Sequence, residues 1–262
     1  MISIKCNFDS IILATKVDVL VYLPNEVSYM HDITSYKERY TFEPFKTLFC
    51  LHGMWDSAEQ WVENTNIVRL AQKNNLALVI PSVGNTFYVN TIYGARFSDF
   101  IAEELMGFVR ALFPLSEKRE DNFVCGMSMG GYGAMRFAFT YPQLFKKALA
   151  FSPTPDLAFA ARFMHTLGVN PDYIVGNWKD ITGSELDLFV IAEKAAERKE
   201  ELPEIMMICG NKDYLNKKAG VFAEHLDNLG IKCGHRIYEG DHTWEFWDEH
   251  LNEAINWLLD KE

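Results

Sequence analysis

The stretch DNFVCGMSMGGYGA, residues 121–134, determines how the rest of the chain is interpreted. It contains a short apolar run, then Ser128 among glycines, then small residues that can open a helix. The spacing Gly126-x-Ser128-x-Gly130 is typical of a nucleophile elbow, a strained strand-to-helix turn that exposes a serine hydroxyl. Glycines are needed there because side chains two positions either side of the serine would collide with the neighbouring strand or helix. A structural glycine-rich turn has the same pattern, so the surrounding chain must distinguish the two interpretations.

Strand and helix patterns alternate on both sides of this turn. Period-two alternation predicts two antiparallel edge strands, at 2–8 and 17–23. Apolar runs predict one strand leading into Ser128 and others at 46–51, 76–81, 147–151, 204–210 and 232–239. Helices are predicted after residue 57, at 98–113, 129–141, 156–167, 186–201, 216–229 and 244–259. We therefore expect an α/β fold with one mainly parallel sheet and helices on both faces, as a single domain over residues 1–262.

The starts of three helices carry polar residues that could cap them. Residues 57–60 read as a capping box. Ser98 or Asp99 could cap the next helix, whose expected buried stripe is Phe100, Ile101, Leu105, Phe108, Val109 and Leu112. Asp241 precedes the last helix, which is expected to begin near Trp244.

Two segments depart from the alternation of strands and helices. Residues 24–44 are polar and aromatic without a clear period, which predicts a long surface loop. Residues 152–203 hold two predicted helices separated by glycines and a proline. We expect this second segment to be an insertion that covers a pocket in the manner of a lid.

Composition narrows the class of partner. The 25 Lys and Arg residues against 36 Asp and Glu give a formal net charge of −11, which disfavours nucleic acid and anionic membranes. A small neutral or cationic substrate is expected instead, and the sequence leaves a homo-oligomer open. Without a basic start and an unbroken apolar segment, no secretory signal is expected. The five scattered cysteines predict reduced thiols in the cytoplasm, and no Cys/His spacing resembles a zinc site, so no metal is expected.

Three residues that could form a nucleophilic site follow predicted strands. Ser128 lies at its own turn, Asp213 follows residues 204–210, and His242 follows residues 232–239. Loops at the carboxyl ends of parallel strands meet at one edge of the sheet, so these side chains are expected to lie together. An imidazole can remove the serine proton, and a carboxylate can hold that imidazole in the right tautomer. The order Ser, Asp, His along the chain is the one that α/β-hydrolases use.

Other residues compete for two of these positions. Asp180 and Asp241 also lie in predicted loops, although Asp241 is better placed to cap the last helix. Asp213 is preferred because it directly follows a strand. The chain has seven histidines, and His242 is preferred because it follows the last strand.

The loop after the strand at 46–51 is the expected oxyanion site. An oxyanion needs preorganised donors, and this architecture supplies them from this loop and from the residue after the nucleophile. We assign them to the backbone N–H groups of Met54 and Met129, with His52 and Gly53 shaping the loop. An ordinary strand-to-helix turn is the alternative interpretation.

Several stretches together resemble the putative-esterase family of α/β-hydrolases, which includes tributyrin esterases, S-formylglutathione hydrolases (esterase D), feruloyl esterases and mycolyltransferases. The matching stretches are 51–53, 93–105, 126–133, 209–213 and 240–244. The chain is most similar to the small tributyrin-esterase-like carboxylesterases, which share its two early strands and its terminal His-x-Trp helix. The resemblance implies hydrolysis of short acyl esters by a triad of Ser128, Asp213 and His242, with no metal or organic cofactor.

The sequence also departs from this family in two places. Residues 54–57 read MWDS where relatives commonly have a glycine-rich form, which changes the expected shape of the acyl pocket. Residues 152–203, which usually determine substrate choice, match no motif. Trp55 and Trp244 are candidates for the pocket wall, with core or rim packing as the alternative.

The leading functional hypothesis is a serine carboxylesterase that hydrolyses short-chain acyl esters through an acyl-enzyme, with acetylated or acylated carbohydrates among the candidate substrates. An S-formylglutathione-type thioesterase or an acyltransferase would use the same triad. A hydrolase scaffold without activity, used only for binding, is the hypothesis from another class.

Overall fold

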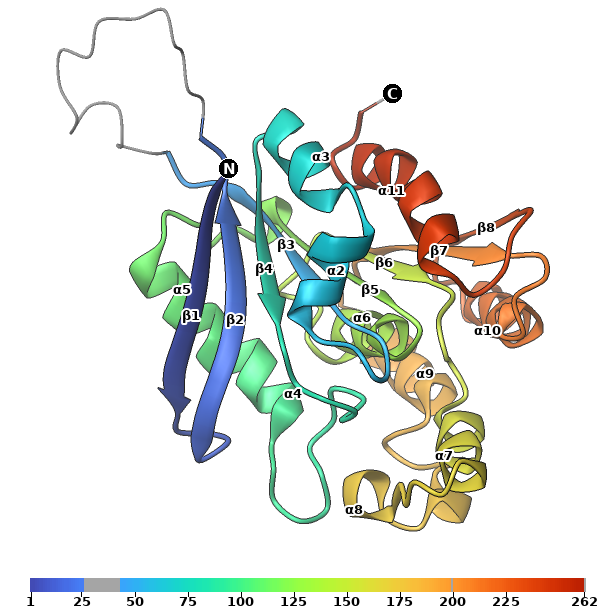
Figure 1. Ribbon diagram of the computed structural model, residues 1–262. Helices are drawn as coiled ribbons and strands as arrows, with labels where there is room; N and C mark the ends of the chain where they lie inside the picture. The colour runs from blue at the N-terminus through green and yellow to red at the C-terminus, as the bar shows by residue number, and fades with distance from the viewer. Residues whose placement is uncertain (26–42, 199, 262) are drawn as a thin grey trace, which may run out of the picture.

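A sheet of eight strands forms the centre of the structure, a computed structural model that describes residues 1–25, 43–198 and 200–261 (Figure 1). The strand order is β1-β2-β4-β3-β5-β6-β7-β8. The strands are β1 (Ile2–Ser10), β2 (Thr15–Leu23), β3 (Lys46–Leu51), β4 (Leu76–Pro81), β5 (Asn122–Met127), β6 (Lys147–Phe151), β7 (Glu204–Gly210) and β8 (Cys233–Tyr238). The pairs β1·β2 and β2·β4 are antiparallel, and every other pair is parallel. The predicted mainly parallel sheet with an antiparallel edge is confirmed.

Helices cover both faces of this sheet. They are α2 (Ala58–Asn64), α3 (Ile67–Lys73), α4 (Phe97–Asp99), the π-helix η1 (Phe100–Leu105), α5 (Met106–Leu112), the 3-10 helix η2 (Arg119–Asp121), α6 (Met129–Thr140), α7 (Leu157–Thr166), α8 (Asp172–Val175), the 3-10 helix η3 (Trp178–Asp180), α9 (Leu188–Arg198), α10 (Asn216–Asn228) and α11 (Trp244–Leu258). Buried residues of α2, α3 and α11 share one core with one face of the sheet. Those of α5, α6, α9 and α10 share the core on the other face.

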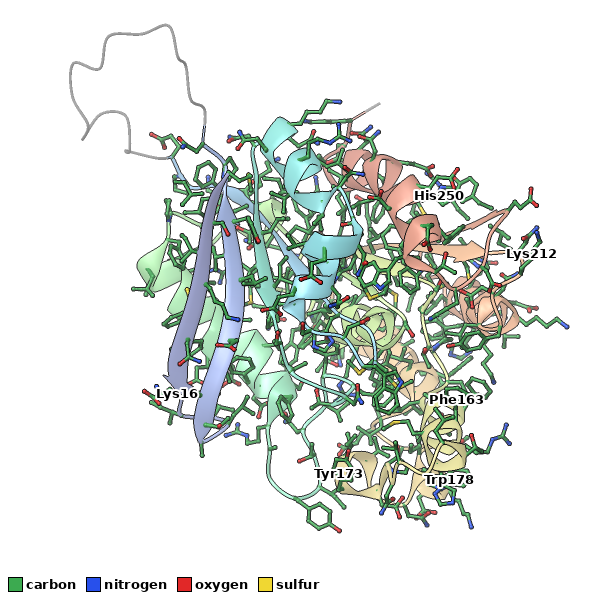
Figure 2. All side chains as sticks on the ribbon, viewed as in Figure 1. Lys16, Phe163, Tyr173, Trp178, Lys212 and His250 are labelled. Carbon is green, nitrogen blue, oxygen red and sulfur yellow. The ribbon has the colours of Figure 1, made fainter. Side chains whose placement is uncertain are left out.

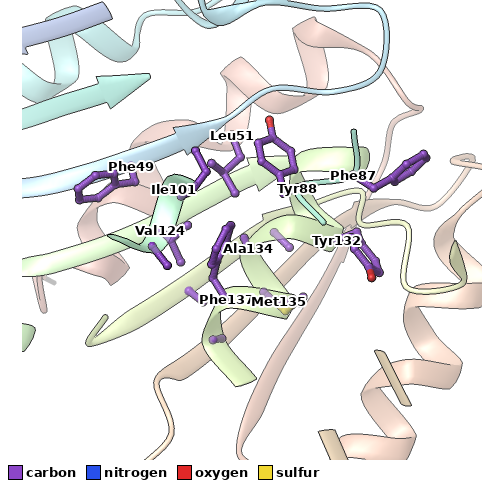
Figure 3. Packing of buried hydrophobic residues seen from close by; sticks show 14 of the residues in the cluster. Phe49, Leu51, Phe87, Tyr88, Ile101, Val124, Tyr132, Ala134, Met135 and Phe137 are labelled. Carbon is purple, nitrogen blue, oxygen red and sulfur yellow. The ribbon is translucent and has the colours of Figure 1, made fainter. Parts of the chain in front are cut away.

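The continuous apolar runs of the central strands follow from burial on both faces. Successive residues of a strand point to opposite sides of the sheet. Val124 of β5 accordingly belongs to the core under α6, whereas Phe123 and Cys125 belong to the core under α11. Figure 3 shows Phe49, Leu51 and Val124 in the first of these cores, with Phe137 of α6 close by. A strand buried on both faces needs consecutive apolar residues, as the sequence has after the polar first positions of these strands.

The helix predicted over residues 98–113 forms, but its start and one buried position were wrong. It begins at Phe97, and Asn90 accepts hydrogen bonds from the backbone N–H groups of Ser98 and Asp99, so neither residue is the cap. Its middle is the π-helix η1. A π turn takes more residues than an α turn, which rotates the residues that follow it. Leu112, expected in the buried stripe, is 59% exposed.

The helix predicted after residue 57 begins at Ala58, but Ser57 makes no side-chain cap hydrogen bond. Its hydroxyl donates to the Glu59 carboxylate instead. The segment is also broken into α2 and α3, which the sequence pattern did not predict. Asp248 of α11 accepts hydrogen bonds from the backbone N–H and the side-chain amide of Asn66, at 2.7 and 2.8 Å. Asp248, which is far from Asn66 in the sequence, therefore fixes the turn between α2 and α3.

The predicted insertion at 152–203 contains α7 and α9 close to the two expected helices, together with α8 and η3, which were not expected. Gly176, at the end of α8, approaches Ile92 in the loop after β4. Figure 2 shows Phe163 on α7 and Tyr173 on α8 at this end of the molecule. Most of the loop predicted at 24–44 lies outside the described residues.

Candidate active site

Ser128 occupies the turn between β5 and α6, as the strand-to-helix pattern predicts. Its backbone has φ 54 and ψ −113, a conformation that residues other than glycine rarely adopt. A Cβ atom at Gly126 would lie 2.1 Å from the Gly130 carbonyl oxygen, and one at Gly130 would lie 2.2 Å from the Leu51 carbonyl oxygen. The strand, the helix and β3 therefore approach one another so closely that both positions require glycine.

Gly130→Ala is expected to lower the free energy of unfolding by more than about 3 kcal/mol, because the clash is with backbone that cannot rotate away. Gly107→Ala is the matched control, since Gly107 lies in α5 and a Cβ there meets no atom within 4 Å. We expect this control to stabilise the protein by about 0.5–1 kcal/mol, through helix propensity alone. Urea unfolding measures both changes. An unfolding free energy of Gly130→Ala equal to that of the unsubstituted protein would contradict the packing described.

His242 and Asp213 are hydrogen-bonded to each other. The Nδ1 atom of His242 lies 2.9 Å from Oδ2 of Asp213. The other oxygen of Asp213 accepts the backbone N–H of Leu215 at 2.8 Å, which fixes the carboxylate plane. A Cβ at Gly210 would lie 2.4 Å from the Gly240 carbonyl oxygen, so the loops after β7 and β8 are in contact. The two loops thus bring together residues that are 29 positions apart in the chain.

The charge state of Asp213 depends on this pairing. Burial pushes the pKa of its carboxyl up, but the hydrogen bond and the charge of His242 outweigh burial and leave the pKa below its usual value. Asp213 is therefore ionised at neutral pH. The stability gained from a lowered carboxyl pKa is present above about pH 4 and is lost as the pH falls through the lowered value.

The two competing aspartates lie elsewhere. Asp180 is the last residue of η3 and accepts a hydrogen bond from the Asn177 amide. Asp241 accepts the backbone N–H of His242 at 2.8 Å. It does not cap α11, because the N-cap is Thr243, whose hydroxyl accepts the backbone N–H of Phe246. The cap expected at Asp241 was thus wrong by two residues.

A cavity of about 290 Å³ holds most of the predicted site residues. Of these, its lining includes Ser128, His242, Gly53, Met54, Trp55 and Trp244. It also includes five residues that the sequence did not single out, namely Asp56, Phe163, Tyr214, Thr243 and Trp247. The rings of Tyr214 and Trp247 lie 4.9 and 5.1 Å from that of His242. Asp213, His52 and Met129 are buried and do not line the cavity.

His52 fixes the loop that follows β3. The backbone N–H of Val83 donates to its Nε2 atom at 3.1 Å, so the ring proton is on Nδ1, which donates to the Gly53 carbonyl at 2.8 Å. Burial lowers the pKa of His52, which keeps the ring neutral. The Gly53 carbonyl belongs to the same peptide unit as the Met54 N–H. His52 therefore orients the peptide that carries the expected oxyanion donor.

The backbone N–H groups of Met54 and Met129 have no hydrogen-bond acceptor among the described residues. Met129 is the first residue of α6, where helix geometry leaves the N–H unpaired. Met54 lines the cavity next to Ser128. Two unpaired donors beside a serine are what an oxyanion would require.

Asp56 is a carboxylate beside the serine that sequence reasoning missed. A Cβ atom at Gly53 would lie 3.0 Å from Oδ2 of Asp56 and 3.7 Å from Cβ of Ser128. Burial raises the pKa of Asp56, and the Gly53 N–H and the charge of His242 only partly offset this. The unusual sequence of residues 54–57 was the signal that could have pointed to it.

Within the described ranges, no group of three or more His, Cys, Asp and Glu side chains is placed to hold a metal ion. All five cysteines have free thiols, and three of them are buried. In the same ranges, no helix is long and apolar enough to cross a membrane.

Comparisons with known proteins agree on one family. The family model described as "Putative esterase" matches residues 10–258. An acetyl esterase from Caldicellulosiruptor saccharolyticus is 30% identical, over 98% of this chain and 98% of that protein. The crystal structure of an S-formylglutathione hydrolase from Staphylococcus aureus is 31% identical, with a TM-score of 0.85 and 98% of both chains covered. A substrate-bound fluorophosphonate-binding serine hydrolase from the same species is 30% identical, with a TM-score of 0.86 and the same coverage.

Proposed function

This chain belongs to the putative esterase family and is a serine carboxylesterase, and we propose that Ser128, His242 and Asp213 form its catalytic triad. The observation that carries this proposal is the 2.9 Å contact between His242 and Asp213, with His242 and Ser128 lining one cavity. The proposal is supported by the position of all three residues after separate strands, with Asp213 in contact with His242 and His242 lining the same cavity as Ser128.

The proposed reaction has two steps. Nε2 of His242 accepts the proton of the Ser128 hydroxyl as its oxygen attacks the ester carbonyl, and the N–H groups of Met54 and Met129 donate to the resulting oxyanion. The carbon–oxygen bond to the alcohol then breaks, and His242 returns the proton to the departing alcohol. Water, deprotonated by His242, then attacks the acyl-serine. The carbon–oxygen bond to Ser128 breaks, the carboxylic acid leaves, and His242 returns the proton to the serine oxygen. Asp213 holds the imidazole through Nδ1 and stabilises its charged form in both steps.

The charge of the cavity favours an uncharged oxygen ester over an S-formylglutathione thioester. Among the described residues that line it there is no Lys or Arg, and Asp56 contributes a carboxyl group. Glutathione carries carboxylates, which such a cavity would repel. We nevertheless retain the thioesterase as the second candidate, because a structural relative is named an S-formylglutathione hydrolase. The small volume, about 290 Å³, favours a short acyl group such as acetyl.

The test is a substrate panel assayed with pure protein. We expect kcat/KM for p-nitrophenyl acetate and butyrate to exceed that for p-nitrophenyl dodecanoate and for S-formylglutathione by at least about tenfold, a difference of 1.4 kcal/mol. Added salt should raise the thioester rate, since it screens the repulsion. A higher kcat/KM for S-formylglutathione than for p-nitrophenyl acetate and butyrate would establish the thioesterase instead. Product analysis with glycerol as acceptor separates hydrolysis from acyl transfer.

We also propose that the enzyme works in the cytoplasm on small-molecule esters, with acetylated carbohydrates as the natural class. Its five free thiols support a reducing compartment, because oxidising compartments favour disulfides. The name of the acetyl esterase relative supports acetyl as the acyl group.

A further inference from the structure

Trp55 is held in a strained backbone conformation that its own packing does not explain. Its φ is 68, in the left-handed region that favours glycine. Phe87 and Tyr88 share this conformation, but both are buried, so their packing accounts for it. Trp55 is 59% exposed. Among the described residues other than glycine with positive φ, it is the one large side chain that lies mostly in solvent.

Neighbouring contacts maintain this conformation. The Trp55 N–H donates to the Asn85 side chain at 2.8 Å. One residue earlier, the peptide between Gly53 and Met54 is held by His52. Strain that is maintained by its surroundings at a site points to a function of the strained residue. Since the indole stabilises no core, its function must lie in what it presents to the cavity.

The rim around Trp55 has the composition of a site for a hydroxylated ring. Tyr214, 54% exposed, and Phe163, 39% exposed, line the same cavity and offer further aromatic faces. Asp56 and Thr243 line the same cavity and add hydrogen-bonding groups. Aromatic faces pack against the C–H face of a ring, and a carboxylate accepts hydrogen bonds from hydroxyls. Ser128 is only 7% exposed, so an ester that reaches it must extend from the enclosed serine to the exposed rim, where the larger half of a short-chain ester has room.

We propose that Trp55 is a specificity residue that stacks on the ring of the alcohol portion of the ester, a single hydroxylated ring of the monosaccharide type, with Asp56 accepting a ring hydroxyl. This inference rests on the proposed function, because it takes the reacting carbonyl to be at Ser128. It adds to the proposed carbohydrate esters the residue that selects their alcohol portion and the way in which that residue binds it.

The experiment compares two acetates with different alcohols, methyl 6-O-acetylglucoside and ethyl acetate. Trp55→Gly is expected to lower the ratio of their kcat/KM values about tenfold, mainly through a higher KM for the sugar acetate, as loss of a stacking contact predicts. Trp55→Phe, which keeps an aromatic face, should restore most of the ratio. Ala14→Gly is the matched control, because Ala14 also has positive φ, at 52, and lies in the turn between β1 and β2. An unchanged ratio in Trp55→Gly would overturn the proposal.

Two further measurements separate the possible outcomes. Trp55→Gly relieves strain, so its apparent Tm should rise by about 2–4 °C, as it should in Ala14→Gly. A fall in Tm would show that the indole has a structural role and would overturn the proposal.

Binding of methyl glucoside, the product alcohol, needs no catalysis, and its Kd should rise about tenfold in Trp55→Gly. If the unsubstituted protein binds methyl glucoside but cleaves no ester, the proposed function fails and the ring site stands. If it cleaves ethyl acetate but does not bind methyl glucoside, the ring site fails and the proposed function stands.

Discussion

Ser128→Ala is expected to lower kcat for p-nitrophenyl acetate by about 10⁵- to 10⁶-fold, the loss that removal of a triad nucleophile produces. The substitution removes the oxygen that attacks the carbonyl and leaves His242 without a proton to accept. Alanine also has a Cβ atom, so the substitution leaves the backbone strain at φ 54 unchanged, and the fold should be retained. Steady-state kinetics and circular dichroism of the same sample measure the two quantities.

The control for this variant is Ser98→Ala. Ser98 is buried to a similar degree, at 2% exposed, and lies at the start of the α4 helix, outside the cavity. Its variant should keep kcat within about twofold, as a substitution outside a reacting group does. A fluorophosphonate probe should label the unsubstituted protein and Ser98→Ala but not Ser128→Ala. Labelling or full activity in Ser128→Ala would show that another residue is the nucleophile.

Asp213→Asn is expected to lower kcat about 10⁴-fold while preserving the shape of the site. The carboxylate accepts the Nδ1 proton of His242, which leaves Nε2 free to take the serine proton. An amide can instead donate to Nδ1, and the imidazole then carries its proton on Nε2, where it cannot act as a base. The KM should change little, because Asp213 lies behind His242 and outside the cavity lining.

Asp241→Asn and Asp180→Asn are the matched controls for the carboxylate. Asp241 contacts the backbone of His242 rather than its ring, and Asp180 accepts a hydrogen bond from the Asn177 amide in the insertion. Both variants should retain kcat within about threefold, because neither removes the imidazole's partner. Loss of activity in Asp241→Asn with full activity in Asp213→Asn would show that Asp241, not Asp213, is the carboxylate of the triad.

The sequence by itself determined the elements and their order. Burial on two faces requires the apolar run of β4 and the one that follows Lys147 in β6, and the predicted bounds of both strands match the observed ones. Gly230, at φ 71, ends α10 as a C-terminal glycine predicts. The placement of Ser128, Asp213 and His242 after their strands also followed from the sequence, because strand ends are local features. The catalytic roles of these three remain predictions that the variants above would test.

Only the tertiary structure decided the features that depend on distant partners. Asp248 fixes the break between α2 and α3, and Asn90 replaces Ser98 as the partner of the first helical N–H groups. Asp56 beside Ser128, and the strained, exposed Trp55, become visible only when β3, β5 and the last loop are brought together. Hydrophobic periodicity reports which face of an element is buried, and it carries no information on which polar groups meet across the fold. These contacts between polar groups determine the chemistry of the cavity, and the packing of the fold determines which contacts form.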